Sequence, residues 1–164
     1  MADVQTDTPS EPMGDAKFWK LVDLVRGSKW DEDTTDFAPL ISVLSSMSPD
    51  EISGFYETLA RKLYALDTRK HHAAFSHFPG FADTFLYTRL AVVAQGEVFY
   101  EEVLRDPQHF PGRSPAIYLE GLLYVAASAY LQATGSEFQR KSSVSVESFS
   151  NDSGWSETTA NPSP

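Results

Sequence analysis

Arg89 is the residue whose type and position most directly require a chemical partner. It lies one helical turn after Phe85, beside an apolar stripe with helical spacing, which consists of Phe85, Leu86, Leu90 and Val93. A guanidinium in such a place is partly desolvated and requires a carboxylate or an anionic ligand. Because a buried charge is ordinarily paired inside the protein, we expect Asp23 or Asp83 to be its partner.

An anionic ligand for Arg89 is the alternative to an internal pair. It predicts a small-molecule or anion sensor, or an enzyme, with a pocket around Arg89 and with Gln95 and Tyr87 assisting. Gln95 precedes Gly96, a helix breaker, so its amide either caps the carbonyls left free at the helix end or binds the backbone of a partner; we favour capping. The candidates for a binding site or a buried polar network are therefore Asp23, Asp83, Arg89 and Gln95.

Three aromatic residues are candidates for a recognition surface, namely Trp19, Tyr87 and Tyr100. Exposed aromatic side chains are enriched at protein interfaces, which is why these residues are considered together. For Trp19 we favour packing in the core over exposure.

Signatures of catalysis and of metal binding are missing from the sequence. His71 and His72 are adjacent, so they point about 100° apart on a helix, and no two histidines have i,i+4 spacing. The acidic run at 31–36 lacks the ligand spacing and the glycine of an EF-hand loop, which indicates a solvated turn. No Gly-x-Ser-x-Gly motif occurs, and no glycine-rich loop precedes a lysine. We therefore expect no catalytic residue, no metal and no cofactor.

Helical periodicity and helix-end residues predict about seven helices. The clearest start is Ser48-Pro49-Asp50-Glu51, which combines a capping serine, a proline at the first helical position and a reciprocating glutamate. Glu57 and Arg61 follow as an i,i+4 pair on the solvent side of that helix. Asp83 is expected to cap the helix that contains Arg89. The expected helices span residues 15–27, 35–44, 48–63, 69–78, 83–95, 97–104 and 114–135.

The chain is predicted to form one all-α domain. Its 164 residues, of which 41% are hydrophobic, are enough for a single core, and no segment alternates with the period of a strand between hairpin turns. We expect one compact bundle of six to seven helices over residues 15–138. A polar and acidic leader at 1–14 and a Ser/Thr/Pro-rich tail at 139–164 are expected to be disordered.

Composition limits the partners. The formal net charge of -10 makes the average surface repel nucleic acid and anionic lipid, so the expected partner is a protein, preferably a basic one. The absence of cysteine excludes a disulfide and fits a reducing compartment. No signal peptide is recognisable and no apolar run approaches ~18 residues, so a cytoplasmic protein that neither crosses nor binds a membrane is expected. The oligomeric state does not follow from the sequence.

One segment, Phe85-x3-Arg89-x5-Gln95-Gly96 followed by Asp106-Pro107, resembles the DUF4240 family of small bacterial helical domains. The opening Phe18-Trp19-Lys20-Leu21-Val22-Asp23 and the later Pro49-Asp50-Glu51-Ile52 are also similar to that family, and the resemblance extends over about residues 17–135. It implies a helical fold without an established activity. Related domains occur in proteins described as molybdate-metabolism regulators and near bacterial toxin loci.

These observations favour a non-catalytic protein-interaction module. In its concrete form it is an acidic immunity-like or regulatory adaptor that docks over a cationic surface of a basic protein, which requires no catalytic residues. The sensor or enzyme built on Arg89 is the rival from another class. A third possibility is that the tail carries the function as a linear motif around Trp155.

Overall fold

Helix α3 (Pro49–Leu66) begins at the strongest start signal in the sequence and forms the centre of the domain. The Ser48 hydroxyl accepts the backbone N–H of Glu51 at 3.2 Å, and the Glu51 carboxylate accepts the backbone N–H of Ser48 at 3.0 Å. This capping box satisfies two backbone donors that a helix start leaves free, as predicted. Helix α3 then buries six apolar side chains completely: Ile52, Phe55, Leu59, Ala60, Leu63 and Leu66.

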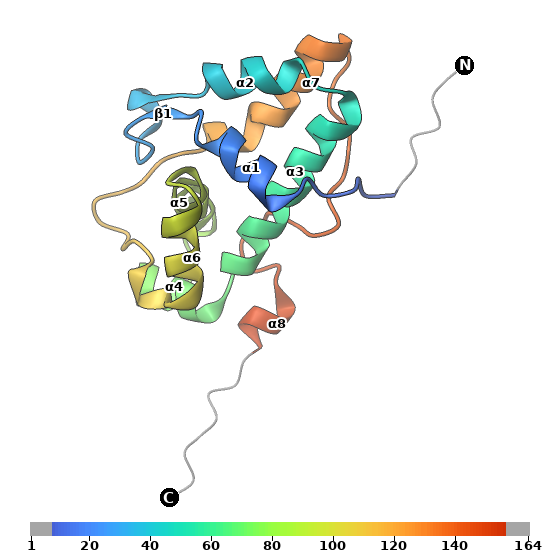
Figure 1. Ribbon diagram of the computed structural model, residues 1–164. Helices are drawn as coiled ribbons and strands as arrows, with labels where there is room; N and C mark the ends of the chain where they lie inside the picture. Colours follow the sequence, from blue (N-terminus) through green and yellow to red (C-terminus); the bar gives the residue numbers. More distant parts are fainter. Residues whose placement is uncertain (1–7, 157–164) are drawn as a thin grey trace, which may run out of the picture.

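The computed structural model describes residues 8–156, and within that range the fold is mostly helical. Around α3, helix α7 packs against α2 at one end of the domain, while α5 and α6 lie together at the other (Figure 1). The other α-helices are α1 (Asp15–Val22), α2 (Ala38–Ser45), α4 (Arg69–Phe75), α5 (Ala82–Ala94), α6 (Glu97–Arg105), α7 (Val125–Thr134) and α8 (Asp152–Trp155). Short 3-10 turns are η1 (Glu32–Thr34), η2 (Pro107–His109) and η3 (Gly121–Tyr124). The predicted all-α class is confirmed.

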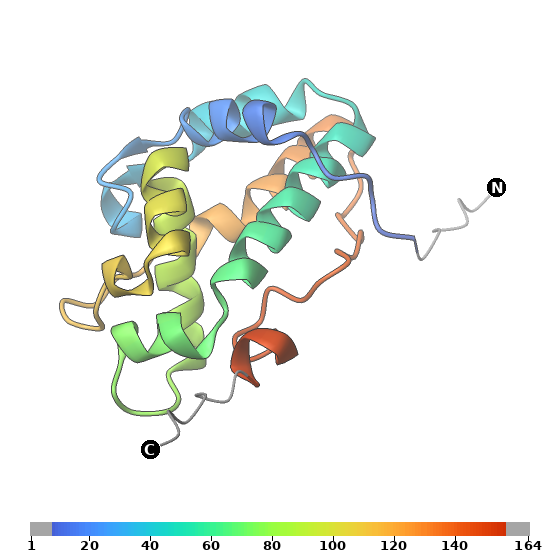
Figure 2. The same ribbon diagram turned by 60° about the horizontal axis from the view of Figure 1, so that its bottom comes forward.

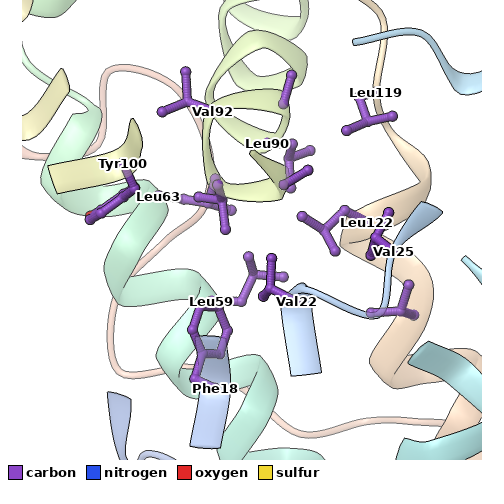
Figure 3. Packing of buried hydrophobic residues seen from close by; sticks show 14 of the residues in the cluster. Phe18, Val22, Val25, Leu59, Leu63, Leu90, Val92, Tyr100, Leu119 and Leu122 are labelled. Carbon is purple, nitrogen blue, oxygen red and sulfur yellow. The ribbon is translucent and has the colours of Figure 1, made fainter. Parts of the chain in front are cut away.

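The core is one continuous cluster of apolar side chains in which α1, α3, α5 and α7 meet. Figure 3 shows Phe18 and Val22 of α1 packed against Leu59 of α3, with Leu63 and Leu90 further along the same cluster. Among the described residues, the last fully buried apolar side chain in the sequence is Ala129. The core is thus completed before the chain leaves α7.

The first predicted helix is shorter than expected. It ends at Val22 instead of running to Gly27, because residues 26–27 form strand β1 (Arg26–Gly27), which pairs antiparallel with β2 (Thr35–Asp36). Gly27 has φ +89°, and a Cβ there would lie 1.9 Å from the carbonyl oxygen of Thr34. Only glycine allows this close turn, so the helix-stop signal was correct in kind and misplaced by a few residues.

The last predicted helix begins about ten residues later than expected. Helix α7 starts at Val125, whereas Ser114-Pro115 was expected to open it. The backbone of Tyr118 instead pairs with the acidic turn, since the carbonyl oxygen of Tyr118 accepts the N–H of Glu32 at 2.9 Å. The predicted end at Gly135 is confirmed, with φ +73°.

The two helices before Gly96 also have corrected boundaries. Helix α4 ends at Phe75, three residues short of the prediction. Helix α5 begins at Ala82, with Phe81 at the cap position, so Asp83 lies in the first turn and does not cap it. The break at Gly96, with φ +102°, is confirmed.

The predicted disordered ends are corrected where the structure describes them. Met13 of the expected leader packs on α3, where its N–H donates to the Gly54 carbonyl and its carbonyl accepts the Thr58 hydroxyl. In the expected tail, residues 143–155 run beside α3 and end in α8 (Figure 2), held by hydrogen bonds to Glu57, Arg89 and Asp67. Composition failed here because backbone hydrogen bonds, together with a few apolar side chains (Met13, Val146 and Trp155), attach these segments to the domain. The predictions for residues 1–7 and 157–164 lie outside the described range.

Candidate functional site

Arg89 is completely buried, but its predicted carboxylate partners are not the groups it contacts. One guanidinium nitrogen donates to the carbonyl of Leu63 at 2.9 Å; the other donates to the carbonyl of Val146 at 3.1 Å and the hydroxyl of Ser148 at 2.9 Å. The guanidinium carbon also lies 4.9 Å from the ring centre of Phe85. Burial lowers the pKa of Arg89 to about 10, while the charges of Asp67 and Glu147 act in the opposite direction. Arg89 therefore stays charged near neutral pH and binds the C-terminal segment of its own chain, residues 143–155.

The other three members of the predicted polar network do not join Arg89. Asp23 is exposed at the end of α1, near Gly96, and Asp83 is exposed in the first turn of α5. Gln95 donates to the carbonyl of Ala91 at 3.2 Å and to that of Lys29 at 2.8 Å. The Ala91 carbonyl already accepts the backbone N–H of Gln95, so the side chain of Gln95 mainly joins α5 to the turn at Lys29 and does not cap a free carbonyl. The predicted pairing of Arg89 with Asp23 or Asp83 is wrong.

Two of the three predicted interface aromatics belong to the core. Trp19 is 3% exposed and Tyr100 is 1% exposed; their rings lie 5.3 Å apart, and the Tyr100 hydroxyl donates to the carbonyl of Lys62. The prediction for Trp19 is confirmed, and exposure of Tyr100 is corrected, because the amphipathic face of α6 turns it inward. Tyr87 is the partly exposed member of the three.

The histidines that lie together in sequence serve the packing of α4. The His71 ring donates from Nε2 to the Val103 carbonyl at 3.0 Å and accepts the Thr68 hydroxyl at Nδ1. Burial lowers the pKa of His71, so the ring is neutral. Within residues 8–156 no group of three or more histidine, aspartate or glutamate side chains is placed to hold a metal ion.

Tyr87 is part of a surface that we call the tyrosine–carboxylate surface, formed by Glu32, Tyr87, Tyr118, Glu120 and Tyr124. Glu120 is its centre: one carboxylate oxygen accepts the Tyr118 hydroxyl at 2.7 Å and the other accepts the Tyr124 hydroxyl at 2.8 Å. Tyr118 and Tyr124 are 46% and 52% exposed, and the rings of Tyr87 and Tyr118 meet edge to face at 4.8 Å. Three aromatic rings therefore surround one carboxylate that solvent reaches.

Four separate parts of the chain bring these residues together. Tyr87 comes from α5, Tyr124 from η3, and Tyr118 and Glu120 from the loop before η3. The acidic turn η1 supplies Glu32, which is fixed by the bond from its N–H to the Tyr118 carbonyl. Gly121 allows this approach, because a Cβ there would lie 2.7 Å from a Glu32 carboxylate oxygen and 2.5 Å from the ring of Phe37.

The charges of this surface are strongly negative. Hydrogen bonds from Tyr118 and then Tyr124 lower the pKa of Glu120 and keep it ionised. The bond to Glu120 raises the pKa of Tyr118 to about 12, with smaller contributions from burial and from Glu32. Burial, followed by the charges of Glu120 and Asp83, raises the pKa of Tyr87. A neutral phenol set around ionised carboxylates offers acceptors and ring faces to a cation.

Sequence reasoning found Tyr87 but missed Tyr118, Glu120 and Tyr124. The signal was present as Tyr118-x-Glu120-x3-Tyr124, yet residues 114–135 were expected to form one helix. On a helix, residues two apart do not share a face. In the loop that actually forms, the same residues converge.

A family model describing a protein of unknown function (DUF4240) matches residues 13–132, which is more than two thirds of the chain. The chain belongs to the DUF4240 family. The match includes α1 to α6 and most of α7 of this DUF4240 protein, together with the whole tyrosine–carboxylate surface, and it ends before the C-terminal segment. No curated protein and no solved structure matches the chain. No helix in the described part of this DUF4240 protein is long and apolar enough to cross a membrane.

Proposed function

We propose that this DUF4240 protein is a non-catalytic interaction module that binds a basic protein and acts as a regulatory or inhibitory adaptor. The proposal rests on a single observation: three tyrosine side chains, Tyr87, Tyr118 and Tyr124, lie around the ionised Glu120 carboxylate. A cationic side chain that binds there would meet the negative charge of Glu120 and the aromatic faces of the tyrosines.

The chemistry of the surface favours an arginine or lysine of the partner. Two lone pairs of the Glu120 carboxylate accept tyrosine hydroxyls, which orient it, and the remaining lone pairs are free to accept further N–H donors. Glu32 adds a second carboxylate beside the same tyrosines. Tyrosine and arginine contribute disproportionately to binding energy in protein interfaces, so this pairing suits a hot spot.

The overall charge supports the same class of partner. A chain with a formal net charge of -10 attracts a basic protein over long range and repels an acidic one. Association should therefore be fast at low ionic strength and weaken as salt is added. The rival function, an anion site at Arg89, lacks this support because both terminal guanidinium nitrogens of Arg89 already donate to Leu63, Val146 and Ser148.

The test compares two variants with the same change in charge. Tagged full-length protein and its Glu120→Gln and Glu101→Gln variants are used to capture partners from native lysate at low and moderate salt, with quantitative mass spectrometry. Glu101 is exposed on α6, outside the surface, and serves as the matched control. We expect a basic protein that the wild type and Glu101→Gln retain and Glu120→Gln loses. Recovery of the tagged chain alone, or equal capture by both variants, would contradict the proposal.

A further inference from the structure

Three charged side chains of the helical domain are buried beneath the segment 143–155, which we call the C-terminal segment. Glu57 on α3 is 1% exposed, and both Asp67, at the end of α3, and Arg89 on α5 are 0% exposed. Isolated buried charges are strongly unfavourable, so each requires hydrogen-bonding partners. For all three, the C-terminal segment supplies them.

Asp67 receives a row of consecutive backbone donors. Its two carboxylate oxygens accept the N–H groups of Phe149 at 2.9 Å, Ser150 at 2.8 Å and Asn151 at 3.1 Å. The indole N–H of Trp155 donates to the same carboxylate at 2.9 Å. Hydrogen bonds to an ionised acceptor are about twice as strong as neutral ones, which makes Asp67 the main anchor of the segment.

Arg89 and Glu57 bind the segment through complementary groups. Arg89 donates to the Val146 carbonyl and the Ser148 hydroxyl, and Glu57 accepts the Ser143 N–H at 2.8 Å as well as the Ser143 hydroxyl. Two of these four contacts, those of the Val146 carbonyl and the Ser143 N–H, use the peptide backbone of the segment. The domain therefore presents two acceptors and one donor to the segment.

The C-terminal segment adds no fully buried apolar side chain to the hydrophobic core. None of the fully buried apolar side chains between residues 8 and 156 follows Ala129; Val146 and Trp155 are only partly buried, and Phe149 is 41% exposed. The family match also ends at residue 132. The segment thus resembles a bound ligand: it satisfies buried charges and packs Val146 and Trp155 against a core whose fully buried apolar side chains all come from earlier residues.

We propose that α3, α4 and α5 form a peptide-binding groove, whose occupant is the C-terminal segment held in cis and exchangeable for the same segment supplied in trans. The ligand class is a serine-rich peptide that turns at Phe149, which has φ +68°, so that three successive N–H groups donate to Asp67; an aromatic residue follows four positions after the last of them. Trp155 takes that aromatic position, with its ring 5.4 Å from that of His72 and its carbonyl bound by Arg69.

The groove is open beside this aromatic anchor. A cleft of about 640 Å³ adjoins Trp155 and Phe149 and is bounded by α4 and the 76–80 loop. Its lining includes none of the five residues of the tyrosine–carboxylate surface, so the groove and that surface are separate. The groove proposal does not rest on the proposed function.

The experiment starts from the full chain with a protease site inserted between Ser136 and Glu137, both of which are exposed. The folded protein is cleaved, and a dye-labelled peptide of residues 139–156 is added while fluorescence anisotropy is followed. Two altered peptides are compared with it. Ser150→Pro removes an N–H donor to Asp67, whereas Asp152→Pro places proline at the first position of α8, where it is tolerated.

We expect the labelled peptide to exchange into the cleaved protein, with Ser150→Pro binding about tenfold more weakly and Asp152→Pro within about twofold of the wild type. The peptides are tested on one unaltered domain, so no result depends on the folding of a variant. Loss of the helical circular dichroism on cleavage and removal of the segment would overturn the proposal, because the segment would then belong to the fold. Failure to exchange, or equal binding of both proline peptides, would overturn it too.

Discussion

The two faces of this domain use carboxylates in opposite ways. Beneath the C-terminal segment, Glu57 and Asp67 are removed from solvent and take backbone N–H groups as partners. On the tyrosine–carboxylate surface, Glu120 stays accessible and takes two phenol hydroxyls as partners. The buried carboxylates are therefore closed to a new partner. Glu120 is held in one orientation and remains accessible to a partner. Burial and the kind of hydrogen-bond donor, more than residue type, decide whether a carboxylate stabilises the fold or is suited to binding a partner.

The largest expected effect breaks the buried face. Arg89→Met should lower the free energy of unfolding by about 3 kcal/mol, because the carbonyls of Leu63 and Val146 lose their donor while buried. Chemical denaturation followed by circular dichroism measures it. Arg105→Met, at an exposed position of α6, is the matched control and should stay within about 0.5 kcal/mol of the wild type. Equal effects would mean that Arg89 has no special structural part.

A smaller effect should depend on pH. Although burial acts to raise the pKa of Glu57, hydrogen bonds from Ser143 and Arg61 outweigh it, and the pKa lies below the usual 4.5. A lowered folded-state pKa stabilises the protein above the unfolded-state value, and the contribution is lost as the pH falls through the folded-state value. Glu57→Gln should therefore be less stable by about 1–2 kcal/mol at neutral pH, with the difference disappearing in acid. Denaturation of both proteins across that pH range provides the measurement; a constant difference would contradict the mechanism.

The exposed face should show binding effects without stability effects. Tyr118→Phe and Glu120→Gln remove one partner of a solvent-accessible bond, so their melting temperatures should match the wild type. Once the basic partner is purified, calorimetry should find about tenfold or greater loss of affinity for Glu120→Gln, since a central charge pair is lost. Glu101→Gln controls for net charge. A variant that binds normally but melts early would reverse the comparison.

The smallest expected change is spectroscopic. The Glu120 carboxylate raises the pKa of Tyr118 to about 12, so this phenol should ionise after an ordinary tyrosine. In Glu120→Gln its pKa should move back down, because the negative acceptor is gone. NMR of tyrosines labelled at Cζ resolves this, and Tyr118→Phe assigns the signal. An unchanged titration in Glu120→Gln would show that the two side chains do not interact in solution.

Local signals in the sequence predicted the parts of the fold that local physics controls. The capping box at Ser48, the breaks at Gly96 and Gly135 and the buried stripe of α3 all depend on residues within one or two helical turns. Burial of Arg89 followed from the same periodicity. The partners of Arg89 could not be predicted in this way, because an apolar stripe indicates that a charged side chain will be buried and need a partner, but not which group that partner is.

The tyrosine–carboxylate surface was only partly predictable for a related reason. Tyr87 was recognised as a candidate, but Glu32 and Glu120 meet it through a loop whose backbone pairs with the acidic turn. That pairing joins residues 31–32 to residue 118, and it produces no periodic pattern in the sequence from which it could be predicted. An expected helix over 114–135 therefore concealed the convergence.

The sequence by itself determined the helical class, the family, the helix starts and stops around α3 and α5, and the need of Arg89 for a partner. The tertiary structure alone decided that the partner is the C-terminal segment, that Glu57 and Asp67 are covered by it, and that three tyrosines surround Glu120. The physical reason is sequence separation. Residues 57 and 143, and residues 67 and 150, lie more than eighty positions apart. The composition around residues 143 and 150 is polar and predicts disorder, because it does not show that buried carboxylates of α3 bind the backbone there.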